Sequence, residues 1–135
     1  KQLAKSIVKN KTGSAAMKAI VEWCDKHIKY AKYPNFQRSP DTVYKKKSGN
    51  CCDGTRFFFT LCDAAGLCQY YNFFYVHVPR TSTLPGHVYG IVETKKTKKW
   101  RYVDMASDRH TCWGYVCQGY SKQNQRNHKY PKLPI

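Results

Sequence analysis

Residues 49–66 read GNCCDGTRFFFTLCDAAG, and this stretch decides the fold. An α-helix turns by about 100° per residue, so apolar residues that recur every three or four positions share one stripe. The stripe is made of Phe58, Leu61, Cys62 and Ala65. Gly49 permits a tight turn into the helix, and Gly66 is suited to end it. The stretch therefore predicts a central helix over Cys51–Ala65.

Two adjacent cysteines open this helix, and the helical phase separates them. Cys51 falls on the apolar stripe, whereas Cys52 is expected to point to the polar flank that holds Arg56 and Asp63. A thiol in the first turn lies near unpaired backbone N–H groups and the positive end of the helix dipole, which favour a thiolate. This position predicts Cys51 as a nucleophile.

Helical patterns precede the central helix. A short helix is expected within residues 1–11, and a second over Ser14–Tyr30 with Ser14 as its N-cap. Ser39-Pro40 is expected to start a further helical turn, because proline suits the first helical position.

Strand patterns follow the central helix. They predict strands over Gln69–Val78, His87–Thr94 and Lys99–Asp104, with the KKTKK segment at 95–99 as a hairpin tip. The last thirty residues are polar and are expected to wrap over the body or fray. Helices first and a strand meander afterwards indicate an α+β fold, with an antiparallel sheet packed against the central helix.

Thiolate chemistry needs an imidazole partner and a group that orients it. His87 begins one predicted strand and Asp104 ends the next. Counted from Thr97, His87 lies 10 residues before and Asp104 lies 7 after, an offset that asks for a bulge or a skewed turn. Each signal alone is usually structural, but a helical Cys followed by a His strand and an Asp strand has the order of a thiol hydrolase or transferase.

Size and charge set the class of protein. The chain has 135 residues, enough for one domain over residues 1–135, and contains no membrane-length apolar stretch and no signal peptide. Its net charge of +16 favours polyanionic surroundings such as nucleic acid, anionic lipid or an acidic polymer. The chain begins at Lys1 rather than Met, so we expect it to be excised from a longer protein.

Two other function classes share part of this pattern. A nucleic-acid-binding module would use the same charge, but the basic residues are scattered and no RRM, KH or zinc-finger signature appears. A zinc module would use His110, Cys112 and Cys117, whose spacing is not the usual close pair. Cys112 and Cys117 can also form a disulfide in an extracellular protein. The eight acidic residues are spread along the chain without a carboxylate cluster, so a calcium site would need backbone carbonyls and the metal site stays unknown.

The stretch GNCCDGTRFFFTLCDAAG resembles the catalytic helix of transglutaminase-like (papain-related) domains, which begins Gly-x-Cys and ends at Gly. Residues 86–107, GHVYGIVETKKTKKWRYVDMAS, resemble the His strand and the Trp-x-x-x-Asp strand of that family. The resemblance implies a transglutaminase-like, papain-like fold with Cys51 as the nucleophile, His87 as the base and Asp104 as the orienting acid.

YAKYPNF at 30–36, GNC-x-D at 49–53 and GHVYG at 86–90 further resemble pseudomurein endoisopeptidases of methanogen viruses and proviruses. This resemblance covers about residues 30–107, and it departs at Cys52 and at Tyr89, where Trp is frequent. It implies a cysteine endoisopeptidase that cuts the Ala–ε-Lys bond in the peptide cross-links of pseudomurein and so lyses the cell wall. A transglutaminase-type acyl transferase stays open, because the acceptor depends on whether water reaches the thioester.

The resemblance also implies partners and a place of action. The partner is pseudomurein, whose uronic acid and glutamate groups suit a basic enzyme. We expect a monomer without a specific nucleic-acid partner, made inside the infected or lysogenic archaeal cell and acting on its wall. Wall-binding repeats are expected before Lys1. The mechanism requires no cofactor, and a divalent cation such as calcium is suggested by the resemblance alone.

The oxyanion of the reaction needs hydrogen-bond donors. We expect the backbone N–H of Cys51 and one side chain, for which Asn50 is the first candidate and Tyr44 or a residue of 33–36 the alternatives. A helix-capping role for Asn50 is equally open.

Overall fold

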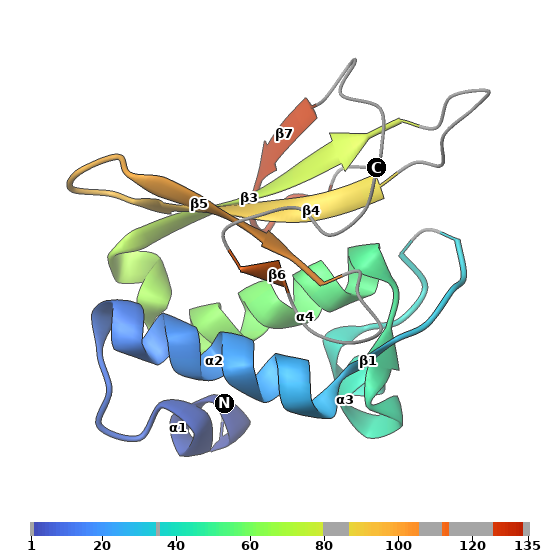
Figure 1. Ribbon diagram of the computed structural model, residues 1–135, viewed down its shortest axis with the longest axis horizontal. Helices are drawn as coiled ribbons and strands as arrows, with labels where there is room; N and C mark the ends of the chain where they lie inside the picture. Colours follow the sequence, from blue (N-terminus) through green and yellow to red (C-terminus); the bar gives the residue numbers. More distant parts are fainter. Residues whose placement is uncertain (1, 35, 80–86, 106–111, 114–125, 134–135) are drawn as a thin grey trace.

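The computed structural model describes residues 2–34, 36–79, 87–105, 112–113 and 126–133, without the side chains of 112, 113 and 126. Its helices gather on one face of an antiparallel sheet (Figure 1). The helices are α1 (Gln2–Val8), α2 (Gly13–His27), α3 (Pro40–Lys46) and α4 (Cys51–Ala64), and the 3-10 turn η1 (Leu67–Gln69) follows α4. The predicted α+β class and the central helix are confirmed.

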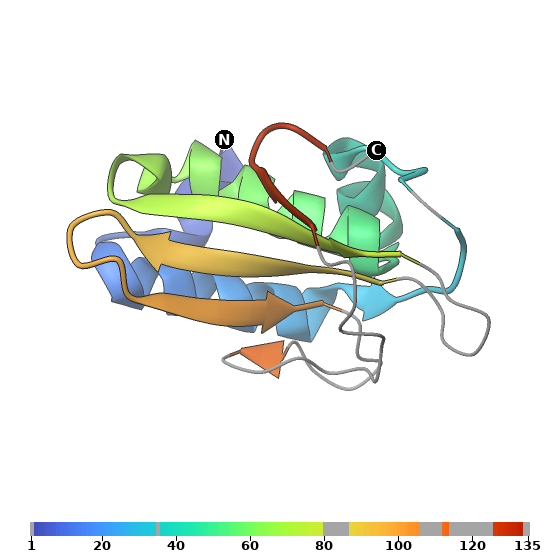
Figure 2. The same ribbon diagram turned by 90° about the horizontal axis from the view of Figure 1, so that it is seen from above.

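The described strands form two sheets. The short β1 (Lys29–Tyr30) and β2 (Ser48–Gly49) pair in parallel just before α4. The large sheet has the order β6-β5-β4-β3-β7, made of β3 (Tyr71–Val78), β4 (His87–Thr94), β5 (Trp100–Asp104), β6 (Cys112–Trp113) and β7 (Arg126–Lys129). Seen from above, β3, β4 and β5 run side by side over the helices (Figure 2).

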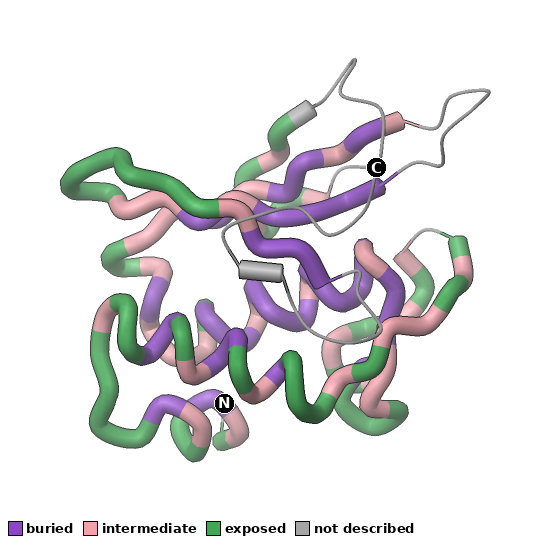
Figure 3. The backbone as a smooth tube through the Cα atoms, viewed as in Figure 1, coloured by how far each residue is buried: buried purple, intermediate pink, exposed green. Residues whose placement is uncertain are grey.

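Close packing fixes α4 against β4. A Cβ atom on Gly90 would lie 2.8 Å from the Phe59 ring and 2.8 Å from Val103, closer than side-chain carbons pack. Gly90 therefore lets the Phe59 ring rest directly on the strand. Helix α4 is covered by the sheet on one side and by α1, α2 and α3 on others, so burial runs along most of its length (Figure 3).

The chain after β5 adds strands that the sequence did not predict. β7 pairs with β3 from Phe74↔Lys129 to His77↔Arg126. Tyr130 then packs edge-on to Phe59 at 5.8 Å between ring centroids and donates a hydrogen bond to Asp63. Segment 126–130 is therefore part of the fold, although its polar residues carry no strand pattern.

Several predicted boundaries were wrong by a few residues. Helix α2 begins at Gly13 with Thr12 rather than Ser14 as its N-cap, and β3 begins at Tyr71 because Leu67–Gln69 forms a 3-10 turn. The helical turn expected at Ser39-Pro40 is α3, and Ser39 caps it by accepting a hydrogen bond from the Thr42 N–H. No helix among the described residues has the length and apolarity needed to cross a membrane.

Candidate active site

Cys51 is the first residue of α4 and is partly exposed, whereas its neighbour Cys52 is buried. The pKa of the Cys51 thiol is lowered to about 5. Hydrogen bonding from Cys52 is the largest cause, and burial opposes it. The hydrogen bonding and charge of His87 and the N–H of Val88 lower the pKa further. Cys51 is therefore held as a thiolate at neutral pH.

His87 and Asp104 form a buried pair beside this thiol. The Nε2 atom of His87 lies 2.8 Å from Oδ2 of Asp104, and the two residues are 2 % and 0 % exposed. Burial is the largest influence on the His87 pKa and lowers it. Hydrogen bonding to Asp104 and Cys51, together with their negative charges, outweighs burial and raises the pKa to about 9. The imidazole is thus held in its protonated form.

Strand register explains how His87 reaches Asp104. β4 pairs with β5 so that Gly90 faces Val103, and the Thr94 N–H donates to the Lys99 carbonyl at 2.8 Å. The hairpin centre therefore lies between Lys96 and Thr97, and the register continues to place Asp104 across from Tyr89. Tyr89 and His87 share a strand face two positions apart, so the pair is a diagonal cross-strand contact. Of the two predicted alternatives, a bulge or a skewed turn, no bulge interrupts the β4–β5 pairs, and the hairpin centre lies before Thr97, where the count had placed it.

The end of β5 also approaches α4 closely. A Cβ atom on Gly54 would lie 3.1 Å from the Cβ of Met105, the residue after Asp104. Glycine at this position leaves room for Met105 one turn after Cys51. It thereby helps to bring the strand that carries Asp104 to the start of the helix.

The prediction that Cys52 points to a polar flank was wrong. Cys52 is 9 % exposed and belongs to the hydrophobic core, because α4 is covered on more sides than a single stripe allows. Hydrogen bonding to Cys51 is the first cause that raises the pKa of Cys52, followed by burial and by the charges of Cys51 and Asp53. Cys52 therefore stays a protonated thiol.

Asn50 caps α4 through its side chain. Its Oδ1 accepts from the Asp53 N–H at 2.8 Å, and its Nδ2 donates to the Tyr33 carbonyl at 2.8 Å. This is the capping role left open above, and the oxyanion role of Asn50 stays a prediction. Tyr44, the alternative donor, lies on α3 with its ring stacked on Trp23 and the Lys47 amine 3.4 Å from its ring centroid.

Sequence reasoning missed Asp53, which is fully buried in the first turn of α4. Its Oδ2 accepts hydrogen bonds from the Tyr33 hydroxyl at 2.5 Å, the Gln37 N–H at 3.1 Å and the Arg38 N–H at 2.8 Å. Asp53 therefore fastens the loop that carries Tyr33, Gln37 and Arg38 to the helix that carries Cys51. The signal was present in the GNC-x-D motif, where an acid follows the thiol by two positions.

Within the described residues, no group of three or more His, Cys, Asp or Glu side chains is placed to hold a metal ion. The side chains of the zinc or disulfide alternative, His110, Cys112 and Cys117, lie outside the described part of the chain.

Comparisons with known proteins agree with this architecture. Residues 1–105, which include Cys51, His87 and Asp104, match the family model described as Transglutaminase-like superfamily. A solved structure from Cytophaga hutchinsonii, described as a candidate cysteine protease, is similar in fold with a TM-score of 0.59 and 12% identity. The match covers 97% of this chain and 50% of that chain, so this chain spans half the length of that protein. No curated protein sequence matches significantly.

Proposed function

This chain belongs to the transglutaminase-like superfamily, and from that premise we propose that it is a cysteine endoisopeptidase acting on methanogen pseudomurein. It would hydrolyse the Ala–ε-Lys bond of the peptide cross-links and so lyse the cell wall. The observation that carries the thiol chemistry is the position of Cys51 beside the His87–Asp104 pair. The choice of substrate is supported by the likeness of residues 30–36, 49–53 and 86–90 and by the net charge of +16.

The first half of the reaction forms a thioester. Between about pH 5 and about pH 9, Cys51 is a thiolate and His87 an imidazolium. The sulfur attacks the isopeptide carbonyl carbon, and backbone N–H donors at the helix start stabilise the oxyanion. Because Nε2 is paired with Asp104, Nδ1 is the ring nitrogen that delivers a proton to the departing lysine ε-amine as the C–N bond breaks.

The second half returns the enzyme to its starting state. His87, now neutral, takes a proton from water, and the resulting hydroxide attacks the thioester carbonyl. The C–S bond breaks, the alanine carboxylic acid leaves and gives its proton to solvent, and the Cys51 thiolate and the imidazolium form again. Asp104 is not protonated in this scheme, because its part is to orient the ring and stabilise its cation.

The test compares Cys51→Ala with Cys52→Ala on a peptide that carries an Ala–ε-Lys bond, measuring release of the lysine amine. Cys51→Ala is expected to abolish release, whereas Cys52→Ala retains it at neutral pH. Full activity of Cys51→Ala would refute the proposed nucleophile. Cleavage of the bond in peptides with no lysis of pseudomurein walls would refute the proposed substrate but not the chemistry.

A further inference from the structure

A second thiol lies beside the nucleophile, and the hydrolysis described above transfers no group to it. Cys51 and Cys52 are the first two residues of α4, so their Cα atoms are about 3.8 Å apart across one peptide bond. Their side chains are also hydrogen-bonded to each other. Any chemical change at the Cys51 sulfur therefore takes place in contact with the Cys52 thiol.

The two thiols differ in exposure and in protonation. Cys51 is partly exposed, whereas Cys52 is 9 % exposed. The Cys51 pKa of about 5 keeps this side chain a thiolate, while hydrogen bonding to Cys51 is the first cause that raises the Cys52 pKa. An accessible thiolate reacts with peroxides, and a protonated thiol beside it can attack the oxidised sulfur.

The other cysteines of the described chain are poor targets for an oxidant. Cys24 and Cys62 are buried, and burial raises the pKa of both. Cys68 is partly exposed, but burial and the charge of Asp63 raise its pKa to about 11. Among these cysteines, a peroxide is therefore expected to react first at Cys51.

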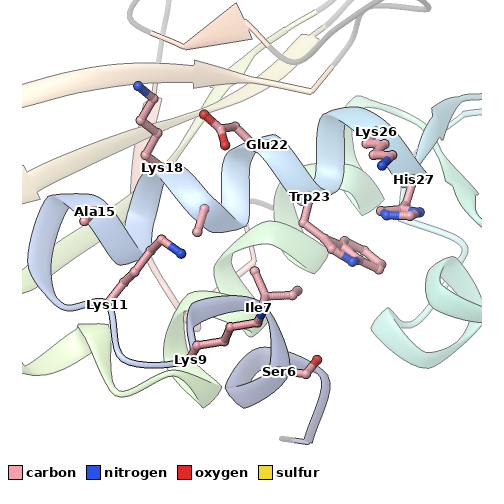
Figure 4. Close-up of a pocket in the computed structure, with 11 residues that line it drawn as sticks. Ser6, Ile7, Lys9, Lys11, Ala15, Lys18, Glu22, Trp23, Lys26 and His27 are labelled. Carbon is pink, nitrogen blue, oxygen red and sulfur yellow. The ribbon is translucent and has the colours of Figure 1, made fainter.

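Surface charge does not create a second reactive thiol at the N-terminal helices. Lysine side chains lower the pKa of a thiol that lies next to them. A groove of about 540 Å³ along α1 and α2 is lined by four lysines, and none of the described residues that line it is a cysteine (Figure 4). The lysines are Lys9, Lys11, Lys18 and Lys26.

The start of a helix is a place where neighbouring cysteines can be joined. The N–H groups of the first helical residues have no partner within the helix, so turning the peptide between Cys51 and Cys52 breaks no helical bond that these two groups donate. The Cys51 carbonyl accepts a hydrogen bond from the Thr55 hydroxyl at 2.6 Å, which such a turn strains. Bridged cysteines usually have Cα atoms about 4.4–6.8 Å apart, so a bridge here is also strained and easily reduced.

We propose that Cys51 and Cys52 form a reversible redox switch, in which a hydroperoxide oxidises Cys51 and Cys52 then closes a disulfide with it. The disulfide removes the Cys51 thiolate and protects this sulfur from irreversible oxidation. Loss of peptidase activity in the bridged state rests on the proposed function. Formation of the disulfide does not, because it requires only the two thiols and the oxidant.

The chemistry balances in two steps. The Cys51 thiolate attacks one peroxide oxygen, so that an S–O bond forms, the O–O bond breaks and hydroxide leaves, which the His87 imidazolium protonates to water. Cys51 is now a sulfenic acid. The Cys52 sulfur attacks the Cys51 sulfur, the S–S bond forms and the S–O bond breaks, and the departing hydroxide takes the Cys52 proton to give a second water. A dithiol reductant later opens the bridge and is itself oxidised to a disulfide.

The test treats the protein with hydrogen peroxide, alkylates free thiols with iodoacetamide after denaturation, and digests with trypsin. Cleavage after Lys47 and Arg56 releases peptide 48–56, SGNCCDGTR, which holds both cysteines and no other. The variant is Cys52→Ser, which keeps a hydrogen-bond donor beside Cys51 but cannot form the bridge. The matched control is Cys68→Ser, which removes the other partly exposed thiol of the described chain. Cleavage of an Ala–ε-Lys peptide is followed in parallel.

In the native protein and in Cys68→Ser, peptide 48–56 should lose two hydrogens and both alkyl labels, and dithiothreitol should restore the labels together with cleavage. In Cys52→Ser, dimedone should trap a Cys51 sulfenic acid, and prolonged peroxide should add two oxygens to Cys51 that dithiothreitol does not remove. Equal recovery of Cys51 in Cys52→Ser would overturn the switch, and so would a native bridge from Cys51 to Cys112 or Cys117. A reversible Cys51–Cys52 bridge in a protein that cleaves no isopeptide bond would support the switch and refute the proposed function instead.

Discussion

Replacing Asp104 with Asn removes one negative charge from a site that is otherwise kept in place. The two side chains have nearly the same shape, and the Asn oxygen can still accept a hydrogen bond from the imidazole. Asp104 is fully buried and lies 2.8 Å from His87, so bulk solvent does not stabilise the imidazolium in place of the lost carboxylate charge. The change therefore isolates the electrostatic part of this contact.

The size of the effect follows from the strength of such contacts. A hydrogen bond to a charged group contributes about 1.5–3 kcal/mol, and 1.36 kcal/mol corresponds to one pKa unit. The His87 pKa, raised to about 9 in the native protein, should thus fall by about one to two units. Burial still lowers the His87 pKa, and without the Asp104 charge less remains to raise it. The weaker imidazolium stabilises the Cys51 thiolate less, so the Cys51 pKa should rise from about 5.

The assay is the pH profile of kcat/KM for isopeptide cleavage, together with the rate of Cys51 alkylation by iodoacetamide read by mass spectrometry. The native profile should be bell-shaped with limbs near pH 5 and pH 9. Asp104→Asn should narrow it from both sides and lower its maximum by about 10²–10⁴-fold. The rate of Cys51 alkylation at pH 6 should also fall in Asp104→Asn. This second measurement does not require a substrate.

Glu93→Gln is the matched control, because Glu93 lies on β4 and its carboxylate accepts a hydrogen bond from Asn72 away from the thiol. It should leave both profiles unchanged. An Asp104→Asn protein with native limbs near pH 5 and pH 9 would refute the reasoning, since the carboxylate would then not control the protonation of His87.

Three further predictions concern residues around this pair. Cys52→Ala should raise the Cys51 pKa and slow the alkylation of Cys51 near pH 5–6, whereas Cys52→Ser keeps a hydrogen-bond donor and should preserve the alkylation rate. Equal alkylation rates in the two variants would contradict the assigned hydrogen bond. Asp53→Asn should speed hydrogen exchange at the Gln37 and Arg38 amides and lower the free energy of unfolding in urea by about 1.5–3 kcal/mol. Unchanged exchange at these amides would show that other contacts hold the loop. Gly90→Ala should cost about 1–3 kcal/mol in the same urea experiment because its Cβ meets Phe59 at 2.8 Å, and native stability would mean that the ring moves aside freely.

Local patterns were sufficient for the central helix and for the strands that carry His87 and Asp104. Helical periodicity, a capping Asn and two flanking glycines all favour a helix over residues 49–66, and tertiary packing favours the same helix. Alternating residues likewise marked β4, whose first residue is His87 as predicted.

The failures share a dependence on contacts from distant segments. Cys52 was placed on a polar flank because its helix neighbours are polar, yet its burial is decided by the elements that pack around α4. β7 reads as RNHK and was invisible, because an edge strand gains its pairing from β3 rather than from apolar side chains. Asp53 was overlooked because its partners, Tyr33, Gln37 and Arg38, lie 15 to 20 residues earlier in the chain.

The buried polar groups are concentrated around Cys51, at the start of α4. The buried polar or charged residues of the described chain are Asn50, Asp53, Thr55, His87 and Asp104. All five lie in or next to the first turns of α4 or in the pair beside Cys51.

Burying charged groups opposes folding unless each is hydrogen-bonded, and apolar residues of similar volume often serve stability as well or better. Two of the eight acidic residues of a chain with net charge +16 are nevertheless fully buried here. One of them holds the imidazole, and the other ties the loop of Tyr33 to the helix of Cys51. Stability alone does not account for this concentration, whereas a thiolate that must keep a fixed imidazolium partner does, because both carboxylates act on the geometry of that pair.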